Sequence, residues 1–447
     1  MKLSLTRSKI WSSKTAFICA FFSFALALAL GLNAPQARAQ APYYFLRLGS
    51  LGGSASSPNS INDLGWITGD ANLSGNQDEH AALWLYGSLH DLGTLGGPNS
   101  ATLWPVHNDT GIIAGVSDTS ITDPLGETWS CAAFMPQSHV GHTCVGFEWR
   151  YGVMTALPTL GGNNGFATGV NNAGIGVGWA ETSFHDPTCT GSQVLQFKAV
   201  VYGPREGQIQ ALPALGTDPD SAATAVNDRG QIVGISGICG IAVGGQSATH
   251  AVLWQRGTVT KLGTLGGGAN NTPMIIDNRG LIAGFSDLVG DEDGANPNFH
   301  AALWTKSDGS QPEDLGTLPG DFFSEATGLN DRGQIVGESC NSTFTFCTAI
   351  LWENGSMIDL NSVIPHGNLY LFFANDINAS GEIAGVALNQ QTGELLGYLA
   401  IPTLGAAEGS FFLTENKVSE VPRVVLPENA REFLMRRLGL SNLLEGR

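Results

Sequence analysis

Apolar and polar positions in this chain alternate in short, strand-like runs around a recurring polar turn. Residues 326–339 read Ala-Thr-Gly-Leu-Asn-Asp-Arg-Gly-Gln-Ile-Val-Gly-Glu-Ser, so small and β-branched residues flank an Asn-Asp-Arg-Gly segment. β-Branched residues favour strands, and a turn that opens with Asn330 and closes with Gly333 suits a type I turn running into a bulge. The pattern predicts two antiparallel strands joined by a tight turn.

The same turn occurs six more times, which predicts a repeat protein. Its closing glycines stand at positions 65, 111, 174, 230, 280, 333 and 381, at intervals of 46, 63, 56, 50, 53 and 48 residues. Between turns lie a further strand, such as His250-Ala-Val-Leu-Trp254, and a glycine corner with its own strand, such as Leu262-Gly-Thr-Leu-Gly-Gly267. Four strands in a period of about 50 residues are typical of a β-propeller blade.

The two ends of the repeat region bear on whether the units form a ring. The seventh unit, at 374–402, lacks its last strand and corner, whereas 43–53 supplies a strand and corner before the first turn. Pairing these segments would complete the last unit and remove exposed sheet edges. We therefore expect an all-β fold, a closed β-propeller of seven four-stranded blades over 40–402, in which the N-terminal strand completes the last blade.

Two terminal segments lie outside the repeats. Residues 1–39 combine a basic start, an apolar run and Ala37-Arg38-Ala39, the pattern of a cleaved secretory signal peptide rather than the alternative, an uncleaved anchor. We expect no transmembrane span in the mature chain and a location in the bacterial periplasm or extracellular medium. Residues 403–447 are predicted to form a linker and a short helix from Pro427 to before Gly439, packed on the propeller or serving as a docking tail.

The charge of the chain argues against some partners. The whole chain has a net charge of −18; five of its 21 Lys and Arg residues and none of its 39 acidic residues precede position 40, so the mature chain has 16 against 39, or −23. Such a charge disfavours nucleic acid and anionic membrane surfaces. We expect a monomer whose partner is a glycan or a secreted or cell-surface protein.

Six cysteines remain after the expected cleavage, and an even number in an exported protein indicates disulfides. The pairings we predict are Cys131–Cys144 and Cys340–Cys347, each within one loop, and Cys189–Cys239 between neighbouring blades. Metal ligation by Cys131, His139, His142 and Cys144 is the weaker alternative, because their spacing matches no familiar zinc motif. We expect neither a metal nor a cofactor.

Three motifs recur in register over residues 43–401: the His-Ala-x-Leu-Trp strand, the Leu-Gly-Thr-Leu-Gly-Gly corner and the Asn-Asp-Arg-Gly-Gln-Ile-Val-Gly hairpin. Their combination resembles the bacterial extracellular HAF-repeat family. One departure is that the third position of the His-Ala-Phe triplet holds Ala, Val or Ile here. The resemblance implies an exported repeat protein and supplies no catalytic residues.

Several polar residues are candidates for ligand binding. His80, His250 and His300 occupy one repeat position in three units, so we expect them to be spaced around the ring rather than clustered, and we favour capping of a strand by hydrogen bonding over a role in ligand binding. Asp291 and Asp293 lie in an acidic loop that could take calcium, although the loop lacks the ligand frame and distal Glu of a calcium loop. The turn asparagines are expected to serve the backbone, and the tryptophans to pack the blades.

Variable loops on a rigid scaffold are where binding surfaces are usually built. In a propeller the glycine corners and the variable connections share one face; these connections span 116–145, 180–197, 235–249, 286–299 and 339–347. We therefore predict a non-catalytic binding module with its ligand face on that side.

The alternatives are a carbohydrate-active hydrolase or lyase on the same scaffold, or a structural envelope component. An enzyme would need converging acidic, His or Arg side chains. Candidates that break the repeat are His107, Asp109, Glu148, His185 and Asp186. An acidic cluster with a raised pKa in the central funnel would favour the enzyme, and an apolar or small-residue funnel the binding module.

Overall fold

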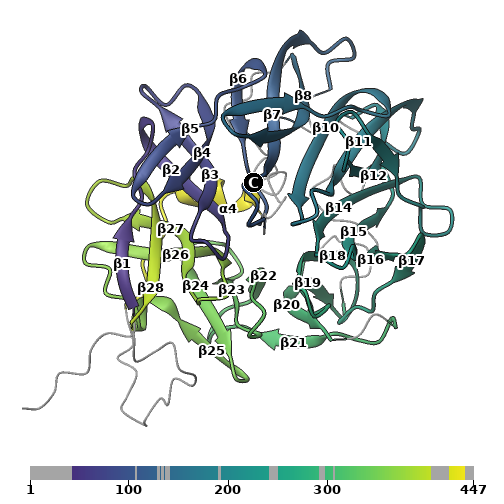
Figure 1. Cartoon of the computed structure of the whole chain (residues 1–447). Coiled ribbons are helices and arrows are strands. Elements are labelled where there is room, and N and C mark those ends of the chain that lie inside the picture. The colour runs from purple at the N-terminus through teal and green to yellow at the C-terminus, as the bar shows by residue number, and fades with distance from the viewer. Residues whose placement is uncertain are drawn as a thin grey trace, which may run out of the picture. The chain divides into compact units, whose positions relative to one another are not determined.

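The computed structural model shows a chain built almost wholly of β-strands (Figure 1). It describes residues 43–105, 108–127, 131, 135, 141–189, 193–240, 250–290, 297–305, 308–403 and 422–437. The predicted signal peptide at 1–39 lies outside these residues. The sheets follow one another in chain order about a common centre within this part of the chain (Figure 1).

Each sheet pairs its strands in sequence order, as a series of antiparallel hairpins. The first contains β2 (Gly52–Ile61), β3 (Ile67–Leu73), β4 (Glu79–Leu85) and β5 (Ser88–Asp91). The second contains β6 (Gly96–Ala101), β7 (Ile113–Thr122), β8 (His142–Arg150) and β9 (Val153–Ala156), and the third β10 (Gly161–Val170), β11 (Gly176–His185), β12 (Leu195–Tyr202) and β13 (Ile209–Ala211).

Three further sheets repeat this order. The fourth contains β14 (Asp220–Val226), β15 (Ile232–Gly237), β16 (His250–Gln255) and β17 (Thr258–Lys261). The fifth contains β18 (Gly266–Ile276), β19 (Ile282–Leu288), β20 (Phe299–Trp304) and β21 (Glu313–Gly316). The sixth contains β22 (Phe323–Leu329), β23 (Ile335–Cys340), β24 (Cys347–Glu353) and β25 (Ser356–Asp359), which a short 3-10 helix at Leu360–Ser362 follows.

The last strands take their fourth member from the start of the chain. β26 (Leu369–Ile377), β27 (Ile383–Asn389) and β28 (Leu395–Pro402) pair in order, and β1 (Tyr43–Arg47) pairs antiparallel with β28 over its whole length. The predicted pairing of the N-terminal strand with the last unit is therefore confirmed. A single parallel bridge between Ala55 and Leu395 joins this group to the first sheet, so the two are continuous.

The turn asparagines connect neighbouring sheets as well as shaping their own turns. In the first turn, Asn62 Oδ1 accepts the backbone N–H groups of Leu64 and Trp66 at 3.1 and 2.8 Å. Its amide Nδ2 donates to the carbonyl of Asn108 in the next turn at 2.9 Å. Equivalent donors follow at 108, 171, 227 and 330, and Asn378 donates back to the carbonyl of Asn62 at 3.0 Å. The last turn is thus bonded to the first.

The Trp-ended strands are tied to the glycine corners. The indole N–H groups of Trp84, Trp254 and Trp304 donate to the carbonyls of Gly49, Pro213 and Gly263 at 2.8 to 2.9 Å. All three indoles are buried, so each tryptophan both packs its sheet and satisfies a corner carbonyl. This is consistent with the packing role predicted for the tryptophans.

All three predicted disulfides are present. Cys131 bonds Cys144, Cys189 bonds Cys239, and Cys340 bonds Cys347. Cys340 and Cys347 face each other across the β23–β24 hairpin, and Cys189–Cys239 links the third sheet to the fourth.

Helix α4 (Glu428–Arg437) follows Pro427 and ends two residues before Gly439, within the predicted segment. Its residues Ala430, Leu434 and Met435 are buried in a cluster that includes Phe372 and Phe373 of β26. The helix therefore packs on the repeats. No helix in the described part of the chain is long and apolar enough to cross a membrane.

Candidate functional site

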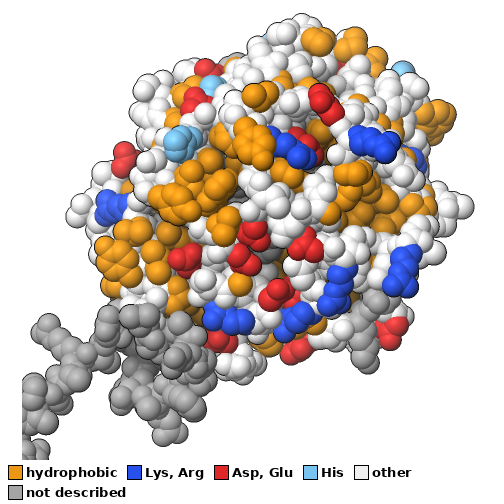
Figure 2. Space-filling view, in the orientation of Figure 1, with side chains coloured by type: hydrophobic (Ala, Val, Ile, Leu, Met, Phe, Trp, Pro, Cys, Tyr) orange, Lys and Arg blue, Asp and Glu red, His pale blue; other side chains and the backbone are white. Residues whose placement is uncertain are grey.

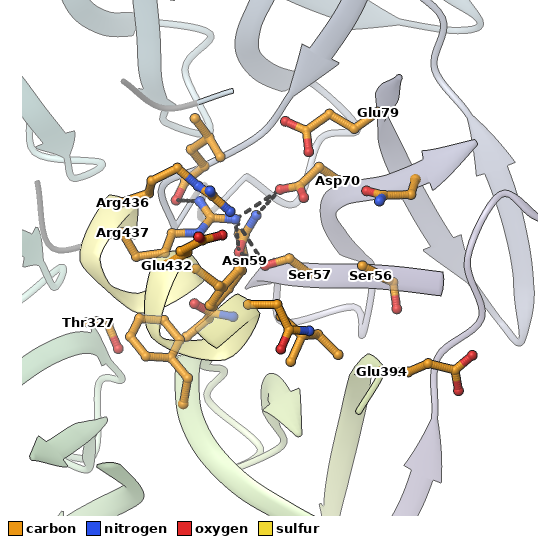
Figure 3. Close-up of a pocket in the computed structure, with 18 of the residues that line it drawn as sticks. Ser56, Ser57, Asn59, Asp70, Glu79, Thr327, Glu394, Glu432, Arg436 and Arg437 are labelled. Atoms are coloured by element: carbon orange, nitrogen blue, oxygen red, sulfur yellow. Dashed lines mark hydrogen bonds and ion pairs between the residues drawn. The ribbon is translucent and has the colours of Figure 1, made fainter. Parts of the chain in front are cut away.

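A cavity of about 640 Å³ lies where α4 covers the innermost strands (Figure 3). β2, β18, β22 and β26, the first strands of four repeat units, contribute to its wall. α4 contributes Asn429, Glu432, Phe433, Arg436 and Arg437. Ser54 and Ala55, which directly follow a glycine corner, place the cavity on the face predicted to bind ligand.

Inside this cavity the guanidinium of Arg437 is held by acceptors from the first sheet. Its Nη2 donates to Asp70 Oδ1, Asn59 Oδ1 and Ser57 Oγ, each at 2.9 Å (Figure 3). Nη1 donates to the carbonyl of Leu103 at 3.3 Å. Asp70 itself is oriented by the amide of Asn59, which donates to Asp70 Oδ1 at 2.8 Å. These four acceptors, which we call the pocket floor, form a binding site for a planar cation such as a guanidinium.

Burial raises the pKa of Asp70, and the nearby Arg437 guanidinium opposes this shift. The side chains of Asp70 and Arg437 are only 11% and 13% exposed, so water screens the ion pair weakly. Since opposite charges at short range favour the ionised forms, the pair neutralises what would otherwise be a costly buried carboxylate.

A second carboxyl group lies beside this ion pair. Glu79, the first residue of β4, is buried, and its Oε1 atom has no hydrogen-bond partner within the described residues. Burial raises the pKa of Glu79 well above its usual range, and the negative charge of Asp70 raises it further. Burial likewise raises the pKa of Glu325 on β22, across the cavity. Of the five acidic residues that line the cavity, one is paired with Arg437 and two, Glu79 and Glu325, favour the protonated form.

One side of the cavity is apolar and anchors the helix. The Phe433 ring makes edge contacts with Phe372 and Phe373, with centroids 6.0 and 5.9 Å apart. The Arg437 guanidinium lies 5.4 Å from the Phe433 centroid, within cation–π range. The same helix thus contributes an apolar anchor and the cation that the floor binds.

The three candidate histidines lie in β4, β16 and β20, in three separate sheets, and none lines the cavity. Each Nδ1 contacts a carboxylate: His80 with Asp91, His250 with Asp218 and His300 with Asp314, at 2.8, 2.8 and 2.9 Å. Burial raises the pKa of Asp314, but the hydrogen bond from His300 opposes it and the net shift is downward. These contacts are consistent with the structural role that the sequence favoured for the three histidines.

The other candidates are not brought together. Asp109 accepts the backbone N–H of Asp63 at 3.0 Å, Glu148 pairs with Arg150 at 3.1 Å, and His185 is an exposed residue at the end of β11. The pKa of Asp220 is raised to about 8 by burial and by the neighbouring carboxyl group of Asp186. His107, His139, Asp291 and Asp293 lie outside the described residues.

A second acidic region lies at the turns. Asp63, Asp109, Asp228 and Asp331 surround a small cavity of about 50 Å³, and each carboxylate accepts the N–H of the neighbouring turn. Figure 2 shows acidic side chains near the middle of the face in view, with basic ones beside them. These turn carboxylates therefore help to hold neighbouring sheets together through hydrogen bonds to backbone N–H groups.

The sequence analysis did not predict Asp70, Glu79, Glu325 or Arg437 as site residues. One feature of the repeats does set Asp70 apart. The residue after the repeated glycine of each second strand is Val116, Trp179, Ile235, Phe285 or Val386 in five units, but Asp70 and Glu338 in the other two. A carboxylate at a repeat position that is apolar in the other units is costly to bury without a partner, so it indicates a functional or specifically paired residue. Nothing in the repeat pattern indicated that Arg437 would meet Asp70.

No protein-family model matches the chain, and no curated protein sequence matches it. Among solved structures, Trypanosoma rangeli sialidase in complex with 2,3-difluorosialic acid is 9% identical, with a TM-score of 0.37 over 80% of this chain and 60% of that one. A gluconolactonase from Xanthomonas campestris is 9% identical, with a TM-score of 0.33 over 80% and 90%. Porphyromonas gingivalis dipeptidyl peptidase 4 is 10% identical, with a TM-score of 0.33 over 75% and 51%. All three scores are below 0.5, and the chain spans about 60% of the sialidase.

Proposed function

We propose that the chain is an exported, closed seven-bladed β-propeller of HAF-like repeats. The hydrogen bond from the last turn to the first, and the addition of β1 to β28, support closure. Three disulfides support an oxidising compartment outside the cytoplasm.

The propeller acts as a non-catalytic binding module, and its ligand site is the cavity between α4 and the innermost strands. One observation carries this proposal: the cavity already holds a polar group of the chain, the Arg437 guanidinium, through acceptors on two strands and a loop. A concave site with a few convergent polar groups beside an apolar wall is the usual form of a ligand pocket. The partner classes expected by analogy with other binding propellers are a glycan or a secreted or cell-surface protein.

A hydrolase or lyase is the second candidate, and the acidic cavity is the observation that favours it. The raised pKa values of Glu79 and Glu325, both caused first by burial, fit a general acid. We rank this function second because the Asp70 carboxylate is engaged by Arg437.

The binding function is tested by blocking the mouth of the cavity. Thr392 is exposed at its rim, and Thr258 is exposed in a hairpin away from it, so Thr392→Trp and Thr258→Trp are matched changes. Residues 40–447 are screened with calcium against arrays of glycans and of peptides from secreted proteins. We expect saturable binding to at least one array member, lost in Thr392→Trp and kept in Thr258→Trp. Equal binding by both variants would place the ligand site elsewhere.

The same ligands decide between the two candidate functions. Each bound glycan is incubated with the wild-type chain and with Glu79→Gln, and the products are followed by mass spectrometry. An intact glycan supports the binding module. Cleavage that Glu79→Gln abolishes would establish the enzyme instead.

A further inference from the structure

We propose that the ligand of this pocket carries an arginine side chain, and that Arg437 is the chain's own internal occupant of the same subsite. The inference rests on the proposed function, because it names the ligand class of that pocket. A peptide segment of a secreted protein that presents arginine is the partner that fits.

The acceptors of the subsite match a guanidinium group. Asp70 supplies a carboxylate oxygen, Asn59 an amide oxygen and Ser57 a hydroxyl, and the Leu103 carbonyl accepts from the other terminal nitrogen. Arginine presents five donors in a fixed planar fork, whereas lysine presents a compact point charge. Three of the four acceptors contact Nη2 and the Leu103 carbonyl contacts Nη1, so a group with two donor nitrogens, arginine rather than lysine, contacts the whole set.

The subsite belongs to the repeats and its occupant to the C-terminal helix. Asp70 and Arg437 are 367 positions apart, and α4 contacts the repeats through few polar bonds besides this one. Asn429 donates to the carbonyl of Gly393 at 3.0 Å, and Arg431 to that of Thr343 at 3.4 Å, both at exposed positions. The helix is thus held mainly by its apolar residues and by the Arg437 contacts.

The pocket contains more carboxyl groups than the one that Arg437 pairs with. Glu79 is buried beside Asp70 with one oxygen that has no partner in the described structure, and Glu394 and Glu432 line the same cavity (Figure 3). Arg436 is a second cation near Glu79, and burial lowers its pKa while Glu79 opposes that shift. An incoming cationic segment would replace these helix cations without leaving the acidic floor unpaired.

An internal occupant lowers the apparent affinity for an external one. If the subsite is open in about 1–10% of molecules, the apparent dissociation constant rises by about ten- to a hundredfold. Removing the Arg437 guanidinium should therefore tighten the binding of an arginyl peptide by that factor. Removing the Asp70 charge should weaken the binding of the arginyl peptide by about ten- to a hundredfold, because a hydrogen bond to a charged group contributes that much to affinity.

The experiment uses the full mature chain and three acetylated, amidated tetrapeptides that differ only in arginine, lysine or the uncharged isostere citrulline. Affinities are measured by calorimetry for the wild type, Arg437→Gln, Arg431→Gln and Arg437→Gln with Asp70→Asn. We expect Arg437→Gln to bind the arginyl peptide about tenfold or more tighter than the wild type. Arg431→Gln, on the same helix but outside the subsite, should match the wild type, and the double variant should lose binding.

Two outcomes would overturn the inference: equal affinity for the arginine and citrulline peptides, or an Arg437→Gln variant that binds no better than Arg431→Gln. Arg437→Lys guards against a folding artefact, because it keeps the charge and should give an intermediate affinity. Hydrogen exchange over 428–437 reports whether the helix stays docked in each variant. If the arginyl peptide fails while a glycan binds in a Thr392→Trp-sensitive way, the inference falls and the proposed function stands. If both fail, the pocket is not a ligand site.

Discussion

Asn171→Asp is the sharpest test of the links between sheets. Asn171 Oδ1 accepts two N–H groups of its own turn, and a carboxylate oxygen can accept them equally well. Its Nδ2 donates to the Asn227 carbonyl at 3.0 Å, and an ionised aspartate cannot replace this donor. The substitution therefore removes one bond between the third and fourth sheets and leaves the turn intact.

The magnitude follows from the surroundings of that bond. A lost hydrogen bond costs about 1 kcal/mol, and a buried carboxylate facing a carbonyl adds about 1 kcal/mol more. The Asn227 carbonyl keeps its bond from Gly230, so the penalty stays at the lower end of the range. An entropy of unfolding of about 2.1 cal/mol/K per residue over about 360 residues converts about 2 kcal/mol into a midpoint lowered by about 2–3 °C.

The chain supplies its own control in the fifth turn, where Asp277 replaces asparagine. There the second carboxylate oxygen is bonded by Arg279 Nε at 2.9 Å. Ala173 is the exposed residue at the corresponding place in the third turn, so Asn171→Asp with Ala173→Arg reproduces the native fifth turn.

Urea unfolding at pH 7, followed by tryptophan fluorescence, measures the free energy of unfolding of each variant. We expect a loss of about 2 kcal/mol for Asn171→Asp and partial recovery in the double variant. At pH 4 the carboxyl group can be protonated and donate again, so the loss should shrink. A loss below about 0.5 kcal/mol at pH 7 would refute a stabilising role for these links.

Two further predictions concern pH and the disulfides. Burial raises the pKa of Asp220 to about 8, so its folded form favours the proton, and its contribution to stability is lost as pH rises from about 4 to 8. Asp220→Asn should remove that loss. Its urea midpoint should therefore exceed that of the wild type at pH 8 and approach it at pH 4. Urea midpoints of the two proteins that change in parallel with pH would contradict this. Replacing Cys189–Cys239 by alanines, which opens a 50-residue loop, should cost about 4 kcal/mol of unfolding free energy, against about 2 kcal/mol for Cys340–Cys347 with its separation of 7. Equal losses in the same urea assay would count against the loop-entropy argument.

Much of the fold could be predicted from the sequence, because turns, hairpins and strand counts depend on residues that are close together along the chain or repeat at a regular period. Each Asn-x-x-Gly turn, such as Asn330 to Gly333, is stabilised by its own side chain, because the asparagine Oδ1 accepts the backbone N–H groups of the residues two and four positions ahead. The Cys340–Cys347 pair follows from a hairpin that holds the two residues opposite each other. The pairing of β1 with β28 followed from counting strands, since an incomplete unit leaves an unpaired edge.

The sequence by itself therefore determined the repeat, the strand order and the disulfides, because these depend on neighbours along the chain or on a regular period. Only the tertiary structure decided the pocket. Asp70 on β3, Glu325 on β22 and Arg437 on α4 come from three distant segments, and no periodicity relates them. Their meeting depends on how the innermost strands converge and on where one apolar helix face finds Phe372 and Phe373. Burial then changes what these groups can do, since a carboxyl group acquires a raised pKa only where packing has removed the water around it.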